Sequence, residues 1–288
     1  MSINFFCGGP IKSGTTLLQR VLDSHPDISC EPEHYFKLLL LDLLVLGDKY
    51  NSNLDNMSNT MGITSRKVEQ YVFLEAFYKI IEEIFDKANE EKEICGINDN
   101  SFIVNNGEAL LNKFKDHKLI YMIRNPIDTA LSTWDHWFRL YKKYNDSEKL
   151  KELQTDGRLD KDQFVIRRAM KWDQHAKYMI SMLEMFPSRV LIIRYEDLTK
   201  EKEMNLEKIL NFLGASSNKK VVKKMSQGST LEKMKKESTN PDFYSKARVD
   251  FGMSVLDKKI IQRSIDLCSS SFNYFDYQNL KKESMLSS

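Results

Sequence analysis

Short apolar runs alternate along the chain with longer segments in which apolar residues recur every three or four positions. The short runs predict buried strands, which are residues 4–7, 94–97, 119–123 and 190–193. The longer segments predict helices, which are residues 15–24, 35–46, 108–114, 127–144 and 164–186, and a helix capped by Thr64 or Ser65 that runs to Ile84. Strands that alternate with helices indicate an α/β fold, in which helices flank a central parallel sheet.

Polar segments separate these elements. We expect a loop that passes through Glu31, Pro32 and Glu33, a second loop at residues 51–62, and a surface loop or lid at residues 145–162. No internal repeat or low-complexity linker divides the sequence. A single domain over residues 1–288 is therefore predicted, with a flexible C-terminal tail at about residues 279–288.

Charge and composition narrow the classes of partner. The 43 basic and 41 acidic residues leave a net charge of +2, which gives no general electrostatic basis for binding nucleic acid or a membrane surface. The longest apolar stretch, residues 38–46, is interrupted by Asp42 and is far shorter than the ~20 residues of a membrane span. The histidines have no metal-ligand spacing, so we expect no metal site. The four cysteines form no CxxC pair and no signal-peptide pattern is present, so we expect a cytoplasmic protein.

A glycine-containing loop joins the first predicted strand to the first predicted helix. It reads Gly9-Pro10-Ile11-Lys12-Ser13-Gly14-Thr15-Thr16, and backbone N–H groups in such a loop converge with the positive helix end on one small volume. A phosphate group suits this volume, and a plain glycine turn with a solvated lysine is the alternative. An ATP-binding P-loop needs a lysine where Thr15 stands, so a P-loop nucleotide kinase is only the second hypothesis.

A second phosphate site is indicated where the strand at residues 119–123 ends. Arg124 follows this strand, Asn125 and Pro126 begin the next helix, and Ser132 lies on its second turn. Arg124 and Ser132 can thus offer a forked cation and a hydroxyl group to one phosphate. A salt bridge between strand and helix is the alternative for Arg124.

Together these two segments resemble the sulfotransferases that use 3′-phosphoadenosine 5′-phosphosulfate (PAPS). Their signature P-[KR]-[ST]-G-[ST]-[ST] is matched here by Pro10 and residues 12–16, with Ile11 standing between the proline and the lysine. Three later segments extend the resemblance, namely residues 194–198 (RYEDL), 209–214 (ILNFLG) and 229–235 (STLEKMK). The resemblance covers residues 4 to about 257. It implies a P-loop-kinase-like sulfotransferase fold and direct, metal-independent sulfuryl transfer from PAPS, with adenosine 3′,5′-bisphosphate (PAP) as product. A non-catalytic relative that binds PAP or PAPS is a further alternative.

The resemblance also implies which residues hold the nucleotide. The 5′-phosphosulfate would contact the first loop, namely Lys12, Ser13, Gly14, Thr15 and Thr16. The 3′-phosphate would contact Arg124 and Ser132, with Lys246 and Arg248 as further ligands or, alternatively, as solvated surface residues. The adenosine would lie among Leu17, Tyr195, Ser229 and Leu231. Leu17 and Leu231 stand where many relatives have Trp and Phe, so stacking on the adenine is weaker there or is supplied by other residues.

Sulfuryl transfer needs a base for the acceptor and a cation near the bridging oxygen, and Lys12 would supply the cation. Residues 25–34 (HPDISCEPEH) resemble the base loop of tyrosylprotein sulfotransferases, which places Glu33 on their catalytic glutamate. His34 and Asp99 are the alternative bases. Glu33 has a structural alternative as well, because a carboxylate there can stabilise the start of the next helix.

Few sequence features indicate where the acceptor binds. His136 stands among Trp134, Trp137 and Phe138, where packing in a helix is the main prediction and an orientation toward the acceptor is the alternative. The implied partner is a small-molecule or glycan acceptor that carries a hydroxyl or amine group.

Overall fold

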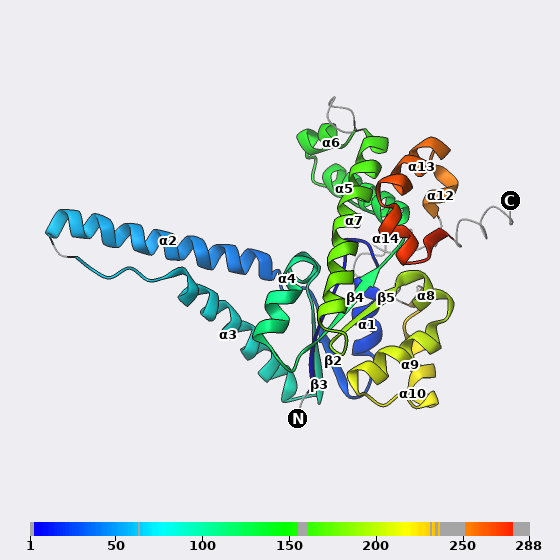
Figure 1. Cartoon of the computed structure of the whole chain (residues 1–288), viewed down its shortest axis with the longest axis horizontal. Coiled ribbons are helices and arrows are strands. Elements are labelled where there is room, and N and C mark those ends of the chain that lie inside the picture. The colour runs from blue at the N-terminus through cyan, green and yellow to red at the C-terminus, as the bar shows by residue number, and fades with distance from the viewer. Residues whose placement is uncertain are drawn as a thin grey trace.

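A computed structural model of the protein describes residues 3–62, 64–154, 160–230, 232–233, 236 and 251–278. Within these residues, five strands form one parallel sheet in the order β2-β3-β1-β4-β5 (Figure 1). The strands are β1 (Ile3–Gly8), β2 (Ile28–Glu31), β3 (Ile94–Asn98), β4 (Lys118–Ile123) and β5 (Val190–Arg194). The predicted α/β fold with a central parallel sheet is confirmed. Leu231, Lys246, Arg248 and the predicted tail at residues 279–288 lie outside the described residues.

Strand β2 corrects the predicted loop through Glu31. It pairs with β3 in parallel, with Ile28 opposite Ile94, and so forms an edge of the sheet. Ile28 and Cys30 are buried, whereas Ser29 and Glu31 are half-buried. A strand of four residues with polar residues at alternate positions gives too few apolar positions to be recognised in the sequence.

Helices cover both faces of the sheet because adjacent strand residues point to opposite sides. Phe5 and Phe6 on β1 show this directly, since each belongs to a different core cluster and neither is exposed. One core contains residues of α3 (Gln70–Asn89), α4 (Asn100–Lys113), α7 (Lys161–Met185), α13 (Lys258–Leu267) and α14 (Ser269–Tyr274). The other contains residues of α1 (Thr15–Asp23), α8 (Tyr195–Lys200), α9 (Lys202–Leu213) and α10 (Lys219–Gly228).

A long helical hairpin projects from this body (Figure 1). It consists of α2 (Phe36–Met61) and α3, so the loop predicted at residues 51–62 is wrong. That segment contains no proline and no glycine before Gly62, which ends α2 in a left-handed conformation with φ of 67°. Asn51 also fixes the hairpin by exchanging two hydrogen bonds with the backbone of Val68, at 2.8 and 2.9 Å. The polar residues of this segment therefore belong to a solvated helix.

Other element boundaries differ from the predictions as well. Helix α3 begins at Gln70 rather than after a cap at Thr64 or Ser65, and α4 begins at Asn100 rather than residue 108. The segment predicted as a loop at residues 145–162 contains helix α6 (Ser147–Gln154). The remaining helices are α5 (Pro126–Lys143) and α12 (Phe251–Val255). Within the described residues, no helix is both long and apolar enough to cross a membrane.

Candidate active site

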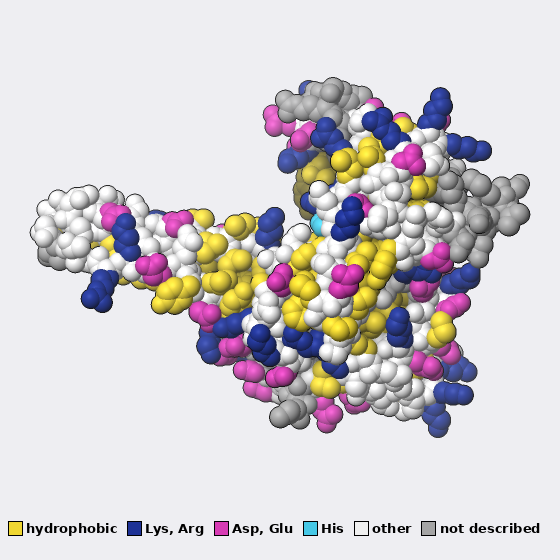
Figure 2. Space-filling model, viewed as in Figure 1, with side chains coloured by type: hydrophobic (Ala, Val, Ile, Leu, Met, Phe, Trp, Pro, Cys, Tyr) yellow, Lys and Arg dark blue, Asp and Glu magenta, His cyan; other side chains and the backbone are white. Residues whose placement is uncertain are grey.

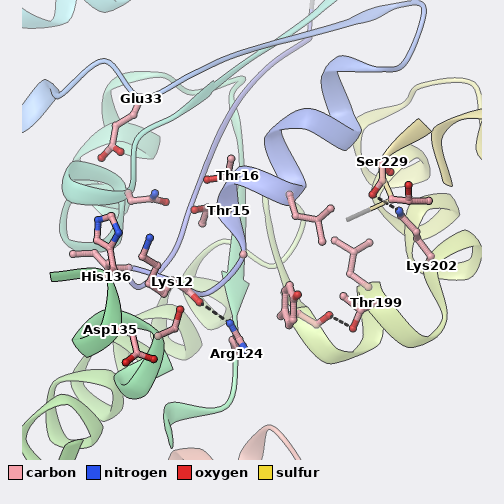
Figure 3. A pocket seen from close by; sticks show the side chains of 18 of the residues that line it. Lys12, Thr15, Thr16, Glu33, Arg124, Asp135, His136, Thr199, Lys202 and Ser229 are labelled. Carbon is pink, nitrogen blue, oxygen red and sulfur yellow. Dashed lines mark hydrogen bonds between the residues drawn. The ribbon is translucent and has the colours of Figure 1, made fainter. Parts of the chain in front are cut away.

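A cavity of about 920 Å³ lies beyond the carboxyl ends of β1 and β4, the edge at which parallel α/β sheets bind ligands. It is enclosed by the loop after β1, the segment before α2, helix α5, and the region from α8 to α10. Most of the predicted site residues line it, namely Lys12, Gly14, Thr15, Thr16, Leu17, Glu33, Arg124, Ser132, Tyr195 and Ser229 (Figure 3). The structure therefore gathers both predicted phosphate sites and the predicted base around one space.

The loop after β1 has a fixed backbone shape. A β-carbon at Gly14, whose φ is 102°, would lie 2.4 Å from the Tyr195 ring, and one at Gly9 would lie 2.1 Å from the carbonyl oxygen of Met122. Lys12 itself has a φ of 68°, a strained conformation for a residue with a side chain. The loop thus lies directly against β4 and the start of α8, where neither Gly9 nor Gly14 leaves room for a side chain.

This loop fits an anionic group. Helix α1 starts at Thr15 with no side-chain cap, so the N–H groups of its first turn have no partner within the helix. The Ser13 side chain is fully buried, and its Oγ has no hydrogen-bond partner among the described residues. A buried hydroxyl group without a partner and an uncapped helix N-terminus both favour a ligand with several acceptor oxygens.

Arg124 is 4% exposed and lies directly after β4. Its guanidinium group lies 4.7 Å from the centre of the Tyr195 ring, and its Nη1 donates to the carbonyl oxygen of Lys12 at 3.4 Å. The alternative salt bridge is also present, because Nη2 lies 3.5 Å from Oδ2 of Asp128. Arg124 and Ser132 nevertheless both line the cavity, as the second phosphate site requires.

Removal of either side chain tests this site. Arg124→Ala is expected to weaken PAP binding by about 1.5–3 kcal/mol and Ser132→Ala by about 1 kcal/mol, because only the arginine carries a positive charge that pairs with the phosphate. Calorimetry with PAP and with adenosine 5′-monophosphate measures the effect. The wild type should prefer PAP and Arg124→Ala should lose this preference, whereas equal wild-type affinities would place the 3′-phosphate elsewhere.

Glu196 holds the segment that carries Arg124. It is 3% exposed, its Oε1 accepts a hydrogen bond from the backbone N–H of Asn125 at 2.9 Å, and Tyr277 Oη donates to its Oε2 at 3.2 Å. Burial raises the pKa of Glu196 to about 7, against the opposing effect of the Asn125 N–H. Asn125 in turn caps α5, since its Oδ1 accepts from the N–H of Ile127 at 2.9 Å. The resemblance at residues 194–198 included Glu196 but did not indicate that its carboxylate fixes the segment after β4.

The raised pKa predicts how stability depends on pH. Between about pH 4.5 and 7 the folded protein retains a proton on Glu196 that the unfolded chain loses, so this residue's contribution falls as pH rises. Relative to Glu196→Gln, the wild type should lose on the order of 3 kcal/mol of unfolding free energy across this range. Urea unfolding at several pH values measures the difference, and parallel curves for the two proteins would contradict the assignment.

Glu33 lies in the segment between β2 and α2, and its side chain lines the cavity with Lys12 and His136 (Figure 3). Buried Asp99 fixes this segment, because its Oδ2 accepts from the N–H of Phe36 at 2.7 Å and its Oδ1 from the N–H of Phe102 at 3.1 Å. Asp99 therefore joins the first turns of α2 and α4. It is not among the residues that line the cavity.

His34 also lies outside the cavity lining. Its ring is stacked on Phe36 at 5.5 Å between ring centres, and its Nε2 is 4.0 Å from Oε2 of Glu31. Of the three predicted bases, the structure thus brings only Glu33 to the cavity with Lys12.

One face of α5 contributes further residues to the site, of which the sequence suggested only His136, as the alternative to packing within the helix. Asp135, His136 and Arg139 follow Ser132 at helical spacing, and all four line the cavity. Burial, with Lys12 and Arg139 nearby, lowers the pKa of His136 to about 4. Burial and Arg139 likewise lower the pKa of Lys12 to about 8. The spacing from Ser132 was the available signal for these residues.

The opposite end of the cavity was also incompletely predicted. Lys202, at the start of α9, lines it and donates to the carbonyl oxygens of Ser226 and Ser229, at 3.0 and 2.8 Å. Ser229 Oγ donates to the carbonyl oxygen of Met225 at 2.6 Å. Lys202 therefore fixes the position of Ser229 beside the predicted adenosine site. No sequence pattern distinguished Lys202 from the other lysines.

Comparison with known proteins identifies the family. A family model described as "Sulfotransferase family" matches residues 4–218. The chain belongs to the sulfotransferase family. This confirms the resemblance that the two phosphate-binding segments indicated.

Curated relatives include both protein-tyrosine and cytosolic sulfotransferases by name. A putative protein-tyrosine sulfotransferase of Caenorhabditis briggsae is 28% identical over 209 residues, which cover 72% of this chain and 64% of that protein. Cytosolic sulfotransferase 14 of Arabidopsis thaliana is 31% identical over 130 residues, which cover 43% of this chain and 36% of that protein. The matched region thus spans less than two thirds of either relative.

Solved structures share the fold at low sequence identity. Mouse sulfotransferase SULT7A1 complexed with PAP has a TM-score of 0.59 and 18% identity, with 99% of this chain and 89% of that chain covered. Retinol dehydratase in complex with androsterone and inactive cofactor PAP has a TM-score of 0.53 and 16% identity, with 93% of this chain and 80% of that chain covered. At these identities the likeness concerns the fold alone.

Proposed function

We propose that the protein transfers the sulfuryl group of PAPS to a hydroxyl or amine group of an acceptor and releases PAP. The carrying observation is that the residues of two predicted phosphate sites, the Lys12 loop and the Arg124–Ser132 pair, line one cavity. PAPS carries a 3′-phosphate and a 5′-phosphosulfate on its ribose, and a nucleotide with only a 5′-phosphate would leave Arg124 and Ser132 without a phosphate to bind. The PAP in the two structural neighbours is consistent with this nucleotide.

In this proposal the first loop and the start of α1 hold the 5′-phosphosulfate, through Ser13, Gly14, Thr15 and Thr16. Leu17, Tyr195 and Ser229 surround the adenosine, and their places in the cavity lining support this role. Leu231, Lys246 and Arg248 are retained as nucleotide ligands on the sequence resemblance.

Glu33 and Lys12 carry out the chemistry we propose. Glu33 accepts the proton of the acceptor group as the acceptor oxygen or nitrogen forms its bond to sulfur. The bond between sulfur and the bridging oxygen breaks at the same time, and its electron pair leaves with PAP. The ammonium group of Lys12 stabilises the charge that develops on that oxygen. His136, uncharged near neutral pH because its pKa is about 4, adds no competing positive charge beside Lys12.

A coupled assay tests the activity directly. Purified protein is incubated with PAPS and phenols, alcohols, amines, glycans and a tyrosine peptide, and the release of PAP is measured with and without EDTA. Release that requires an acceptor and persists in EDTA supports the proposal. A P-loop kinase would instead use ATP and lose activity in EDTA. A non-catalytic relative would bind PAP but release none from PAPS.

The compartment and the partner are part of the same proposal. All four cysteines are free and buried, which supports the reducing cytoplasm as the protein's location. The acceptor is proposed to be a small molecule or a glycan, because Glu33 is half-buried in the lining of a cavity of about 920 Å³.

A further inference from the structure

Helix α2 exposes an apolar stripe on the part of its length next to the body. Leu38, Leu41 and Val45 are 57%, 48% and 64% exposed. Their spacing of three and four residues places them on one side of the helix, and Asp42 borders the stripe. A contiguous exposed apolar surface of this kind indicates a binding function.

The hairpin does not need this stripe for its own packing. Helix α3 packs on another side of α2, where the ring of Phe73 lies against Gly47 so closely that a β-carbon there would be 2.7 Å from it. Leu39, Leu40 and Leu43 pack against the core from that side. The stripe therefore lies on the side of α2 that faces away from α3. Figures 1 and 2 show an open notch between the hairpin and the helices α5 and α6.

The stripe is continuous with the active-site cavity. Tyr35 immediately precedes α2, lines the cavity, and is 60% exposed. Its left-handed backbone, with φ of 55°, turns the chain from the Glu33 segment into the helix. An apolar path therefore leads from the cavity mouth at Tyr35 along Leu38 and Leu41 to Val45, over ~15 Å at 1.5 Å per residue.

The chemistry beyond Val45 limits what can occupy the stripe. The same side of α2 continues with Asp48, Lys49 and Ser52, so the stripe ends about three turns into the helix. The exposed apolar residues farther along α2, which are Leu46, Tyr50, Met57 and Met61, lie on a different side of the helix, whereas helix pairing between two copies favours one apolar seam along the whole helix. Residues 36–89 contain eight acidic and six basic residues, which gives no attraction to an anionic membrane. A short apolar chain anchored in the cavity matches both limits.

We propose that the stripe of Leu38, Leu41 and Val45 binds the apolar chain of an amphiphilic acceptor, whose terminal hydroxyl group enters the cavity. This substrate class rests on the proposed sulfuryl transfer. The chain lies on a surface that remains partly open to solvent, so each added methylene group is about half buried.

A series of primary alcohols from butanol to decanol, each below its solubility limit in water, tests the proposal. With PAPS as donor, kcat/KM of the wild type should rise about twofold per methylene, or on the order of 60-fold across the series. Leu41→Ser and Val45→Ser should reduce this gain to a few fold. Met57→Ser is the matched control, because Met57 is 53% exposed on the same helix outside the stripe and should keep the full gain. Thermal unfolding verifies that all variants fold.

Binding of the alkyl sulfate products in the presence of PAP, measured by calorimetry, separates the two proposals. Affinity that rises with chain length and falls in the Leu41 and Val45 variants supports the stripe even if no alcohol is turned over, in which case the proposed catalysis fails. If alcohols are turned over but kcat/KM does not rise with each methylene, the stripe proposal is overturned and sulfuryl transfer stands. The same conclusion follows if Met57→Ser reduces the rise in kcat/KM as much as Leu41→Ser and Val45→Ser do. Sedimentation that shows a wild-type dimer and a Val45→Ser monomer assigns the stripe to a second copy and also overturns the proposal.

Discussion

Glu33→Gln is expected to lower kcat by roughly 10²- to 10⁴-fold, the loss typical of a missing general base, while PAP affinity stays near the wild-type value. Glutamine keeps the size of the side chain but cannot accept the acceptor's proton. Glu33 lines the cavity on the side of Lys12 and His136, away from Ser229 and Lys202 at the adenosine end (Figure 3). The change should therefore separate catalysis from nucleotide binding. Steady-state kinetics with a saturating acceptor and calorimetry with PAP measure the two quantities.

Two control variants distinguish this role from its alternatives. His34→Asn should keep near-normal turnover, because His34 stacks on Phe36 outside the cavity lining. His136→Asn removes a further proton-accepting side chain of the cavity and should lower kcat far less. If His136→Asn were inactive and Glu33→Gln active, the base would be the histidine on α5. The pH profile adds a check, since a carboxylate base gives an acidic limb that disappears in Glu33→Gln.

A structural role for Glu33 would give a different pattern. Helix α2 is capped at Tyr35 without any side-chain hydrogen bond, and Asp99 already accepts from the N–H of Phe36 at the start of the helix. If Glu33 stabilised the helix through its charge, glutamine would lower the melting temperature and not kcat. The two measurements together decide between catalysis and helix stabilisation.

The strands and phosphate sites could be predicted because their signals are local. Fully buried strands such as β4 form unbroken apolar runs, and the turns that bind phosphate require particular residues, as Gly14 shows by its contact with Tyr195. Both sites lie at the carboxyl ends of parallel strands, so the order of strands and helices alone brought them to one edge of the sheet.

The remaining features depend on contacts between distant residues. Strand β2 is stabilised by pairing with β3, which lies more than 60 residues away, and its own sequence has only two inward-facing apolar positions. The outer half of α2 contains polar residues typical of loops, and it lies beside the extended segment that precedes α3 (Figure 1). Its contacts there come from a distant part of the chain, since Asn51 exchanges hydrogen bonds with Val68 and Asp55 pairs with Lys67. Lys202 reaches the cavity through hydrogen bonds to Ser226 and Ser229, which no local pattern specifies. Partners that lie far apart along the chain cannot be recognised from a local sequence pattern.

Lys12→Ala is expected to lower kcat by about 10²- to 10³-fold, with a much smaller loss of PAP affinity, because its charge acts mainly on the bridging oxygen in the transition state. Lys37→Ala, at an exposed lysine on α2, serves as the control and should leave both quantities unchanged. An unchanged kcat in Lys12→Ala would refute the assignment.

The pH dependence gives an independent test of the same residue. Burial and the nearby Arg139 lower the pKa of Lys12 to about 8, so the free enzyme loses the ammonium charge as pH rises through that value. The wild-type kcat/KM, which reports the free enzyme, should therefore fall above about pH 8. The anionic donor favours the charged lysine, so the limb in kcat should lie at higher pH. Lys12→Arg keeps its charge throughout this range and should lose the basic limb, whereas a limb that persists unchanged would assign it to another group.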